Sequence, residues 1–351
     1  MLSVENLSVV YEVGDTEVYA LQNVSFEVLP HENLGIVGES GCGKTSLIKA
    51  LLRLLPRNGR VSGGSVLFDG KDLLTLTASE MRKIRWKRIS FVTQAAMNAL
   101  NPVLTVKRQM TEAIMTHTPA IDHNTAVESA ERLFKLVGLN PNRLANYPHQ
   151  FSGGMKQRAV IAMALALNPD IIVADEPTTA LDVIVQAQIL EKLLELHQGT
   201  NNSLILVTHD MAVVAQICTR VIVMYGGKIM ENGSVEDIFY TPYHPYTMGL
   251  RNAFPNLIGP KQLLISIPGT PPSLRAKSHG CIFADRCPFA IGECQETTPP
   301  LHQVAPNHWA ACHLTDNAGQ MRERSADRAT WTEVAARQSP APGTGKVATH
   351  D

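Results

Sequence analysis

One stretch, residues 38–45, constrains the fold of this chain more than any other. It reads Gly-Glu-Ser-Gly-Cys-Gly-Lys-Thr and fits the pattern G-x-x-x-x-G-K-[ST] of a phosphate-binding loop. An apolar run precedes it and a helical run, 46–55, follows it, which is the strand–loop–helix context that such a loop requires. The glycines let backbone N–H groups turn toward phosphate oxygens, and the helix adds the positive end of its dipole. We therefore predict that Lys44 contacts the β and γ phosphates of a nucleotide and that Thr45 holds Mg²⁺.

Two acidic residues follow a second apolar strand. Residues 171–174 are apolar, and Asp175 and Glu176 come directly after them, as at the C-terminal end of a buried parallel strand, where such sheets bind ligands. We expect Asp175 to hold Mg²⁺ through water and Glu176 to activate the attacking water. A third apolar strand, 203–207, ends just before His209. We expect this histidine on the same rim of the sheet, within reach of the γ phosphate.

The remaining pattern predicts a mixed α/β fold. Alternating apolar residues indicate short strands ahead of the phosphate loop, which favours a mixed sheet with an antiparallel edge. Residues 95–166 are mostly helical in pattern and look like an insertion between two parts of that sheet. Within it, Ser152, Gly153 and Gly154 precede a helix that runs to residue 167.

Composition limits the class of protein. The chain has 351 residues, is 44% hydrophobic and 18% charged, and has a net charge of −1, so nothing in its overall charge points to nucleic acid. No apolar run approaches the ~18 residues that a membrane span needs. The first residues lack the basic and apolar regions of a signal peptide. We predict a cytoplasmic protein whose role at a membrane would require partners.

Together these residues resemble the ATPase subunit of an ABC transporter over roughly residues 1–235. Residues 38–45 resemble its Walker A loop, Gln94 its Q-loop, residues 152–154 its signature motif and residues 171–176 its Walker B strand. Residues 180–182 resemble the D-loop and His209 the switch histidine, while Tyr11 falls where the family stacks an aromatic ring on adenine. The departures from the usual motifs remove no catalytic group; they are Phe151 and Met155 around the signature motif, Cys42 in the Walker A loop and residues 95–96 after Gln94. Cys42 makes the loop a candidate for alkylation.

The resemblance implies a P-loop NTPase of the ABC type that binds ATP and Mg²⁺, with a mixed sheet and a helical signature subdomain at about 95–166. The catalytic residues that it implies are Glu176, His209 and Gln94, and the Mg²⁺ ligands are Thr45, Gln94 and Asp175. The ATP-binding residues are Tyr11, Gly38, Glu39, Ser40, Gly41, Cys42, Gly43, Lys44, Thr45, Ser46, Gln94, Ser152, Gly153, Gly154, Asp182 and His209.

Residues 240–314 resemble one branch of the family more narrowly. The segments 244–247, 267–272, 280–281, 286–288 and 311–313, together with Cys294, look like the C-terminal region of oligopeptide and dipeptide importer ATPases. We therefore predict an ABC ATPase domain at 1–235 and a small cysteine-containing C-terminal region at 236–314. Residues 315–351 have little apolar content, which predicts a disordered tail.

Four of the six cysteines, Cys281, Cys287, Cys294 and Cys312, gather in this C-terminal region, whereas Cys42 and Cys218 look like loop and core residues. Close thiols in a cytosolic protein indicate metal more often than disulfides. Some members of this branch hold an iron–sulfur cluster on these cysteines, and four thiolates suit a [4Fe–4S] cluster or a Cys₄ zinc site. The paired knuckles typical of zinc ribbons are absent, and unmetallated thiols are the third alternative.

The resemblance implies a subunit that hydrolyses ATP to energise an ABC importer, with di- or oligopeptides as the first expectation for the solute. The same motor also serves nickel, glutathione and oligosaccharides, and a soluble ABC ATPase outside transport is the remoter alternative. The implied partners are a second ATPase subunit, which is either the same or a different chain, two transmembrane permease subunits and, indirectly, an extracytoplasmic solute-binding protein. No nucleic-acid partner is implied. The expected location is the cytoplasmic face of the inner membrane, with peripheral attachment.

Overall fold

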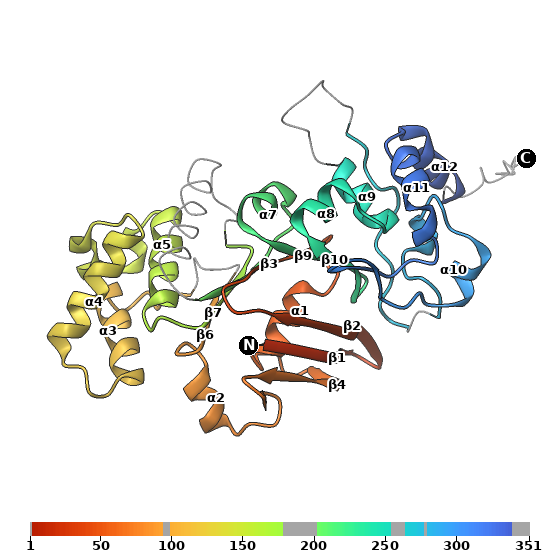
Figure 1. The fold of residues 1–351 in the computed structure, drawn as a ribbon. Helices are drawn as coiled ribbons and strands as arrows, with labels where there is room; N and C mark the ends of the chain where they lie inside the picture. Colours follow the sequence, from red (N-terminus) through yellow and green to blue (C-terminus); the bar gives the residue numbers. More distant parts are fainter. Residues whose placement is uncertain (1, 94–98, 178–201, 254–263, 277–278, 339–351) are drawn as a thin grey trace, which may run out of the picture.

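Two β-sheets form the framework of the protein in a computed structural model that describes residues 2–93, 99–177, 202–253, 264–276 and 279–338. The smaller sheet is antiparallel, in the order β2-β1-β4-β5, and the larger runs β11-β12-β10-β9-β3-β8-β7-β6 (Figure 1). The strands are β1 Leu2–Val13, β2 Thr16–Val28, β3 Asn33–Val37, β4 Gly59–Phe68, β5 Lys71–Asp72, β6 Ile89–Val92, β7 Ile171–Asp175, β8 Ser203–Val207, β9 Arg220–Tyr225, β10 Lys228–Ser234, β11 His302–Ala305 and β12 His308–Ala310.

The larger sheet is buried on both faces at its centre. Strands β3, β7 and β8 are buried along their whole length and pair in parallel, as their continuous apolar runs predict. Alternate residues of β8 enter two different cores. Ile205 and Val207 pack with helix α1 (Lys44–Leu51) and the antiparallel sheet, whereas Leu204 and Leu206 pack with helix α7 (Met211–Ile217) and the C-terminal helices. This double burial fixes the strand ends that carry the predicted site.

The helices cover the larger sheet and form a separate group at one end, where Figure 1 shows α3, α4 and α5 together. A capping box at Thr77 and Glu80 begins α2, and α4 ends just before Gly138, whose φ of 70° favours glycine. The helices are α1 Lys44–Leu51, α2 Ala78–Ile84, α3 Val106–His117, α4 His123–Leu136, α5 Gly153–Leu165, α7 Met211–Ile217, α8 Val235–Tyr240, α9 Pro245–Asn252, α10 Gly292–Glu296, α11 Ala318–Ser325 and α12 Arg328–Gln338, with 3₁₀ helices η2 Pro141–Ala145, η3 Pro148–Gln150, η4 Ala284–Arg286 and η5 Thr315–Asn317. In the described part of the chain, no helix combines the length and the apolar character that a membrane span requires.

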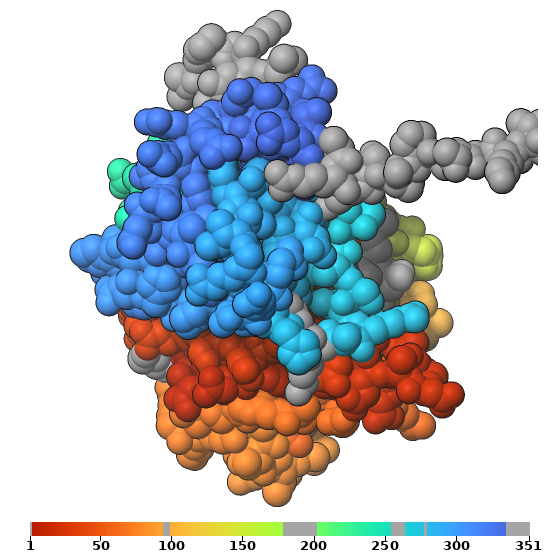
Figure 2. All heavy atoms as spheres, turned by 90° about the vertical axis from the view of Figure 1, so that its right-hand side faces the viewer, coloured from red at the N-terminus to blue at the C-terminus, as the bar shows by residue number. Residues whose placement is uncertain are grey.

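The C-terminal residues extend the larger sheet. Strand β12 pairs with β10, and β11 pairs with β12, so residues beyond 300 lie in the same sheet as the strand that leads into the phosphate loop. The Tyr19 N–H also donates to the Leu274 carbonyl oxygen at 2.8 Å, which ties β2 to this region. Figure 2 shows the C-terminal residues packed directly above the N-terminal strands.

The prediction of a disordered tail is wrong for residues 318–338, which form α11 and α12. Two apolar side chains anchor them, because Met321 and Trp331 are 3% and 2% exposed and join the core beneath the sheet. The Trp331 indole N–H and the Asn252 amide both donate to the Ser325 carbonyl oxygen, which caps α11. Low apolar content misled the sequence analysis because a helix that docks on an existing surface needs only a few apolar contacts. Residues 339–351 lie outside the described residues.

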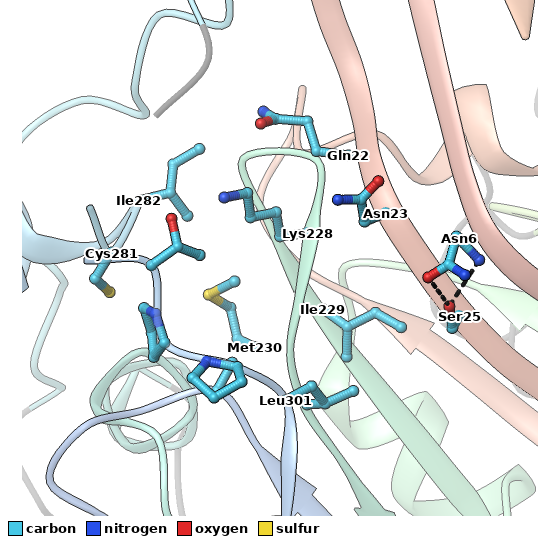
Figure 3. A pocket seen from close by; sticks show the side chains of 14 residues that line it. Asn6, Gln22, Asn23, Ser25, Lys228, Ile229, Met230, Cys281, Ile282 and Leu301 are labelled. Atoms are coloured by element: carbon cyan, nitrogen blue, oxygen red, sulfur yellow. Dashed lines mark hydrogen bonds between the residues drawn. The ribbon is translucent and has the colours of Figure 1, made fainter. Parts of the chain in front are cut away.

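A cavity of ≈ 390 Å³ lies where the C-terminal region meets the antiparallel sheet (Figure 3). Gln22 and Asn23 of β2 line one side, and Lys228 of β10 and Cys281 line the other. Burial lowers the pKa of the Lys228 ammonium, while the charge of Cys281 acts in the opposite direction. No phosphate-loop residue lines this cavity, so it is separate from the predicted nucleotide site.

Candidate nucleotide site

The phosphate loop joins β3 to α1 and depends on two glycines. Gly38 has φ 151° and Gly43 has φ 106°, which favours glycine at both positions. A Cβ atom at Gly38 would lie 2.2 Å from the Met224 carbonyl oxygen, and one at Gly43 would lie 2.5 Å from the Ala20 carbonyl oxygen. Both backbones therefore leave no room for a side chain, and the loop has the compact form that the sequence predicts.

Lys44 is held inside this loop. Its Nζ donates to the carbonyl oxygens of Gly38 at 2.7 Å and Glu39 at 3.0 Å, and it lies 3.6 Å from Cys42 Sγ. The residue is only 6% exposed although it carries an ammonium group. A buried cation surrounded by loop carbonyls is well placed to receive an anionic ligand.

Thr45 and Asp175 meet although they are far apart in the sequence. Asp175 ends β7 and is 2% exposed, and this burial raises the pKa of its carboxyl group. A hydrogen bond with the Thr45 hydroxyl and the charge of Lys44 both lower that pKa. The structure thus brings together two of the three predicted Mg²⁺ ligands, whose oxygen atoms are of the type that Mg²⁺ prefers. The third, Gln94, lies outside the described residues.

Glu176 and His209 meet at the ends of two adjacent strands, β7 and β8. His209 Nδ1 lies 3.2 Å from Glu176 Oε1. Glu176 has φ 46°, a conformation that costs a residue with a side chain about 1–3 kcal/mol. Its N–H donates to the Val207 carbonyl oxygen at 2.8 Å, which holds the backbone in this conformation. The side chain of His209 is 65% exposed and that of Glu176 is 17% exposed, so the pair faces the open rim of the sheet.

Tyr11 lies beside the helix that follows the loop. Its hydroxyl donates to Ser46 Oγ at 3.2 Å, and Ser46 lies in the first turn of α1. The Tyr11 ring packs partly buried against the core under the antiparallel sheet. The structure therefore places the predicted adenine-stacking ring next to a predicted ATP-binding residue.

Residues 152–154 open α5, where Ser152 is the N-cap and its hydroxyl accepts a hydrogen bond from the Met155 N–H at 3.3 Å. Helix α5 packs against α4 and β6, and Figure 1 shows it with the helical group, away from α1. Within one chain, the signature segment therefore does not complete the site around the phosphate loop. The predicted ATP-binding residue Asp182 lies outside the described residues.

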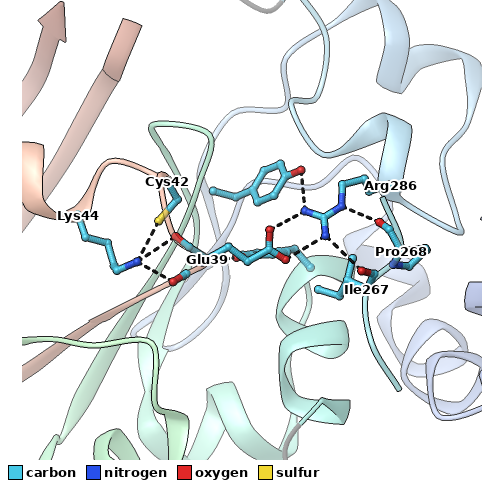
Figure 4. Close-up of polar contacts among 9 residues, drawn as sticks. Glu39, Cys42, Lys44, Ile267, Pro268 and Arg286 are labelled. Atoms are coloured by element: carbon cyan, nitrogen blue, oxygen red, sulfur yellow. Dashed lines mark hydrogen bonds and ion pairs between the residues drawn. The ribbon is translucent and has the colours of Figure 1, made fainter. Parts of the chain in front are cut away.

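The Glu39 side chain makes a contact that the sequence analysis missed (Figure 4). Its carboxylate accepts two hydrogen bonds from Arg286, at 2.6 and 3.0 Å, and its N–H donates to Tyr246 Oη at 2.9 Å. Arg286 belongs to the Arg-Cys-Pro segment 286–288, which carries the family resemblance but does not by itself predict this contact. A loop residue predicted to bind ATP is thus held by the C-terminal region.

The four C-terminal cysteines lie in one neighbourhood. Burial raises the pKa of Cys287 well above its usual value and that of Cys312 to about 12. The charges of the neighbouring thiols raise both pKa values further, and the Cys281 N–H donates to the Cys294 carbonyl oxygen at 2.7 Å. Among the described residues, however, no group of three or more His, Cys, Asp or Glu side chains is arranged to hold a metal ion. The donor set suits a metal, but the geometry gives the predicted cluster no support.

Cys42 is expected to react slowly with iodoacetamide at pH 7, contrary to the alkylation expected from the sequence. Its side chain is buried, and this burial raises the pKa of the thiol although the charge of Lys44 lowers it. Because the thiolate is the nucleophile, the rate should be lower than that of N-acetylcysteine at pH 7 and should rise steeply above pH 9. Mass spectrometry of the peptide containing Cys42 measures this rate. Complete labelling of Cys42 within the half-life of N-acetylcysteine would contradict the expectation.

The β3–loop–α1 unit, with acidic residues at the end of β7 and a histidine after β8, defines a P-loop ATPase. The sequence matches the family described as ABC transporter over residues 21–179 and the family described as oligopeptide/dipeptide transporter, C-terminal region, over residues 230–294. The probable peptide ABC transporter ATP-binding protein y4tR of Sinorhizobium fredii is 47% identical over 89% of this chain and 94% of its own length. The oligopeptide transport ATP-binding protein OppD of Escherichia coli is 44% identical over 89% of this chain and 92% of its own. The chain belongs to the ATP-binding proteins of the oligopeptide/dipeptide ABC transporter family.

Solved structures agree on the fold. A dimeric post-hydrolysis structure of the ATP-binding cassette MJ0796, bound to ADP and Pi, superimposes with a TM-score of 0.61 and is 30% identical. The match covers 67% of this chain and 99% of that one. The mixed sheet of an ABC ATPase, predicted from the sequence, is thereby confirmed, as is the assignment of this chain as an ATP-hydrolysing transport subunit.

Proposed function

We propose that this chain energises the import of di- or oligopeptides by an ABC transporter at the cytoplasmic face of the inner membrane. The observation that carries the proposal is that the ATPase motifs and the C-terminal region occur in one chain, as in relatives named for peptide, oligopeptide and dipeptide transport. Two permease subunits and a second ATPase subunit would complete the transporter, and an extracytoplasmic solute-binding protein would deliver the solute. Nickel, glutathione or an oligosaccharide are the alternative solutes.

Each residue of the site has a separate role in the proposed hydrolysis of ATP. Lys44 would bind the β and γ phosphates from inside the loop, and the paired Thr45 and Asp175 would hold Mg²⁺, with Gln94 as a further ligand. Mg²⁺, when bound, would neutralise charge that develops on the phosphates. Glu176 would accept a proton from the attacking water, and His209, 3.2 Å away, would orient that carboxylate and contact the γ phosphate.

The remaining predicted ATP-binding residues imply two copies of the ATPase. Tyr11 would stack on adenine near its own loop, while Ser152, Gly153 and Gly154 would face the phosphate loop of the second subunit. The N-terminus of α5 offers backbone N–H groups to the γ phosphate, so ATP itself would bridge the two subunits. Hydrolysis removes this bridge, and opening of the dimer would drive the permease between its two states.

Reconstitution tests the transport proposal directly. Proteoliposomes that contain this chain, its partner ATPase and the permease pair should accumulate a labelled tripeptide only when ATP and the binding protein are present. A matched preparation with labelled Ni²⁺ should show no uptake. ATP-dependent uptake of Ni²⁺ without uptake of any peptide would reassign the solute, while recovery of the chain from cells without permease subunits would contradict the transporter role.

We propose in addition that Cys281, Cys287, Cys294 and Cys312 hold a [4Fe–4S] cluster, with Zn²⁺ as the alternative. The support is the chemistry of the donor set, because this one region supplies four thiols and three of them are buried. Protein purified without oxygen should contain about four iron and about four sulfide ions per chain, the composition of a [4Fe–4S] cluster. The Cys287→Ser variant should lose most of both. About one zinc without iron would replace the cluster by a structural zinc site, and the absence of any metal would refute both.

A further inference from the structure

We propose that Arg286 of the C-terminal region is a positioning residue for nucleotide binding and acts through Glu39 of the phosphate loop. Arg286 Nη1 and Nη2 donate to the two carboxylate oxygens of Glu39 at 2.6 and 3.0 Å (Figure 4). Although 247 residues separate them in sequence, the two side chains form a two-pronged ion pair, the geometry for which arginine is best suited. The inference rests on nucleotide binding at the phosphate loop, as proposed above.

Arg286 is fixed from several sides and cannot follow the loop if the loop moves. It is 4% exposed, and its Nε donates to the Pro268 carbonyl oxygen at 2.8 Å. Nη1 also donates to Tyr225 Oη at 3.1 Å, and Nη2 to the Ile267 carbonyl oxygen at 3.3 Å. The guanidinium therefore presents a rigid fork to Glu39, which makes the C-terminal region an anchor for the loop.

Glu39 is engaged through its backbone as well as its side chain. Its N–H donates to Tyr246 Oη at 2.9 Å, and its carbonyl oxygen accepts from Lys44 Nζ at 3.0 Å. Tyr246 is buried against Tyr225 and Phe283, with ring centroids 4.6 and 5.3 Å away. A shift of Glu39 would therefore move an acceptor of Lys44, the side chain expected to bind the phosphates. The contact network connects Arg286 to the proposed nucleotide site through one intermediate residue.

The charge of Glu39 explains why this anchor matters for binding. A carboxylate in a loop that receives phosphates repels them unless a cation neutralises it. Arg286 supplies that cation, and it also holds the carboxylate on the side of the loop that faces the C-terminal region. Loss of Arg286 would leave the negative charge in the loop and release the loop at the same time. Removing the carboxylate as well should undo the electrostatic part of the defect.

A set of variants tests this coupling in the full-length protein. In Arg286→Ala, the Kd for a non-hydrolysable ATP analogue with Mg²⁺, measured by titration calorimetry, should rise about tenfold. Arg286→Lys keeps the charge without the fork and should show a rise of about threefold. The double variant Arg286→Ala with Glu39→Gln should recover to within about threefold of wild type. When the rate of hydrolysis is measured over a range of ATP concentrations, KM of Arg286→Ala should rise by a larger factor than kcat falls.

Arg220→Ala is the matched control. Arg220, the first residue of β9, also makes a two-pronged ion pair, with Glu32 at 2.6 and 3.0 Å, but Glu32 precedes β3 whereas Glu39 follows it in the phosphate loop. It should lower the thermal stability in the same way as Arg286→Ala and leave the Kd for the nucleotide unchanged.

An unchanged nucleotide Kd in Arg286→Ala, or in Arg286→Lys if the alanine variant does not fold, would overturn the proposal. So would a double variant that binds no better than Arg286→Ala alone. If wild type and the Arg220→Ala control do not bind the analogue at all, the nucleotide site itself is misassigned and the proposal falls with it. Normal wild-type binding with no effect at Arg286 refutes only the positioning role.

Discussion

Glu176→Gln is expected to bind ATP as tightly as wild type while its rate of hydrolysis falls by about 10²- to 10⁴-fold, the usual contribution of a general base. Glutamine keeps the size of the side chain and its hydrogen-bonding capacity toward His209 Nδ1, which lies 3.2 Å from Glu176 Oε1. It cannot accept a proton from the attacking water. The backbone at this position, with φ 46°, is equally strained for both residues, so folding should be unaffected.

Steady-state phosphate release and nucleotide titration together measure this result. Glu296→Gln, an exposed position in α10, is the matched control and should hydrolyse ATP at the wild-type rate. Because ATP would persist between two subunits, Glu176→Gln should also form a stable dimer when ATP is added. Wild-type turnover in Glu176→Gln would show that another group activates the water. Loss of ATP binding would show that Glu176 also contributes to the binding of ATP before hydrolysis.

The parts of the fold that the sequence predicts are those set by local chemistry. Strands β3, β7 and β8 are continuous apolar runs, and only a position buried on both faces of a sheet accepts such a run. The glycines of the phosphate loop and the cap at Ser152 follow from backbone requirements that neighbouring residues define. The pairing of Thr45 with Asp175 was predictable as well, since parallel strands bring their carboxyl ends to one edge.

The contacts that the sequence analysis missed depend on how distant segments pack. Nothing in the spacing around Arg286 or Glu39 indicates that they meet, because the pairing arises only when the C-terminal region lies over β9 and β10. Strand β12 and helices α11 and α12 were missed for a related reason. They are short and largely polar, and a few buried contacts such as Trp331 hold them on a surface that the rest of the chain provides.

Lys44→Ala is expected to weaken the binding of ATP by at least about 100-fold, or ~2.7 kcal/mol. Lys44 Nζ already lies among the carbonyl oxygens of the loop, where it is 6% exposed and needs little rearrangement to reach a phosphate. A charge-assisted hydrogen bond contributes about 1.5–3 kcal/mol, and the ammonium is expected to form one with each of two phosphates. The variant should remain folded, because removal of a buried cation also removes the cost of its desolvation.

Lys49→Ala provides the control because Lys49 lies at the other end of the same helix. The charges of both lysines lower the pKa of Asp175, but among the described contacts only Lys44 donates to the loop carbonyls. If ATP is attracted only by the overall positive charge near the loop, the two variants should weaken binding to the same extent. High salt should then reduce the difference between each variant and wild type. If the direct contact decides, Lys49→Ala should bind within about twofold of wild type, a factor worth only ~0.4 kcal/mol. Calorimetric titration with the non-hydrolysable analogue at two salt concentrations separates these outcomes, and equal losses would contradict the role of Lys44 as the phosphate-binding residue.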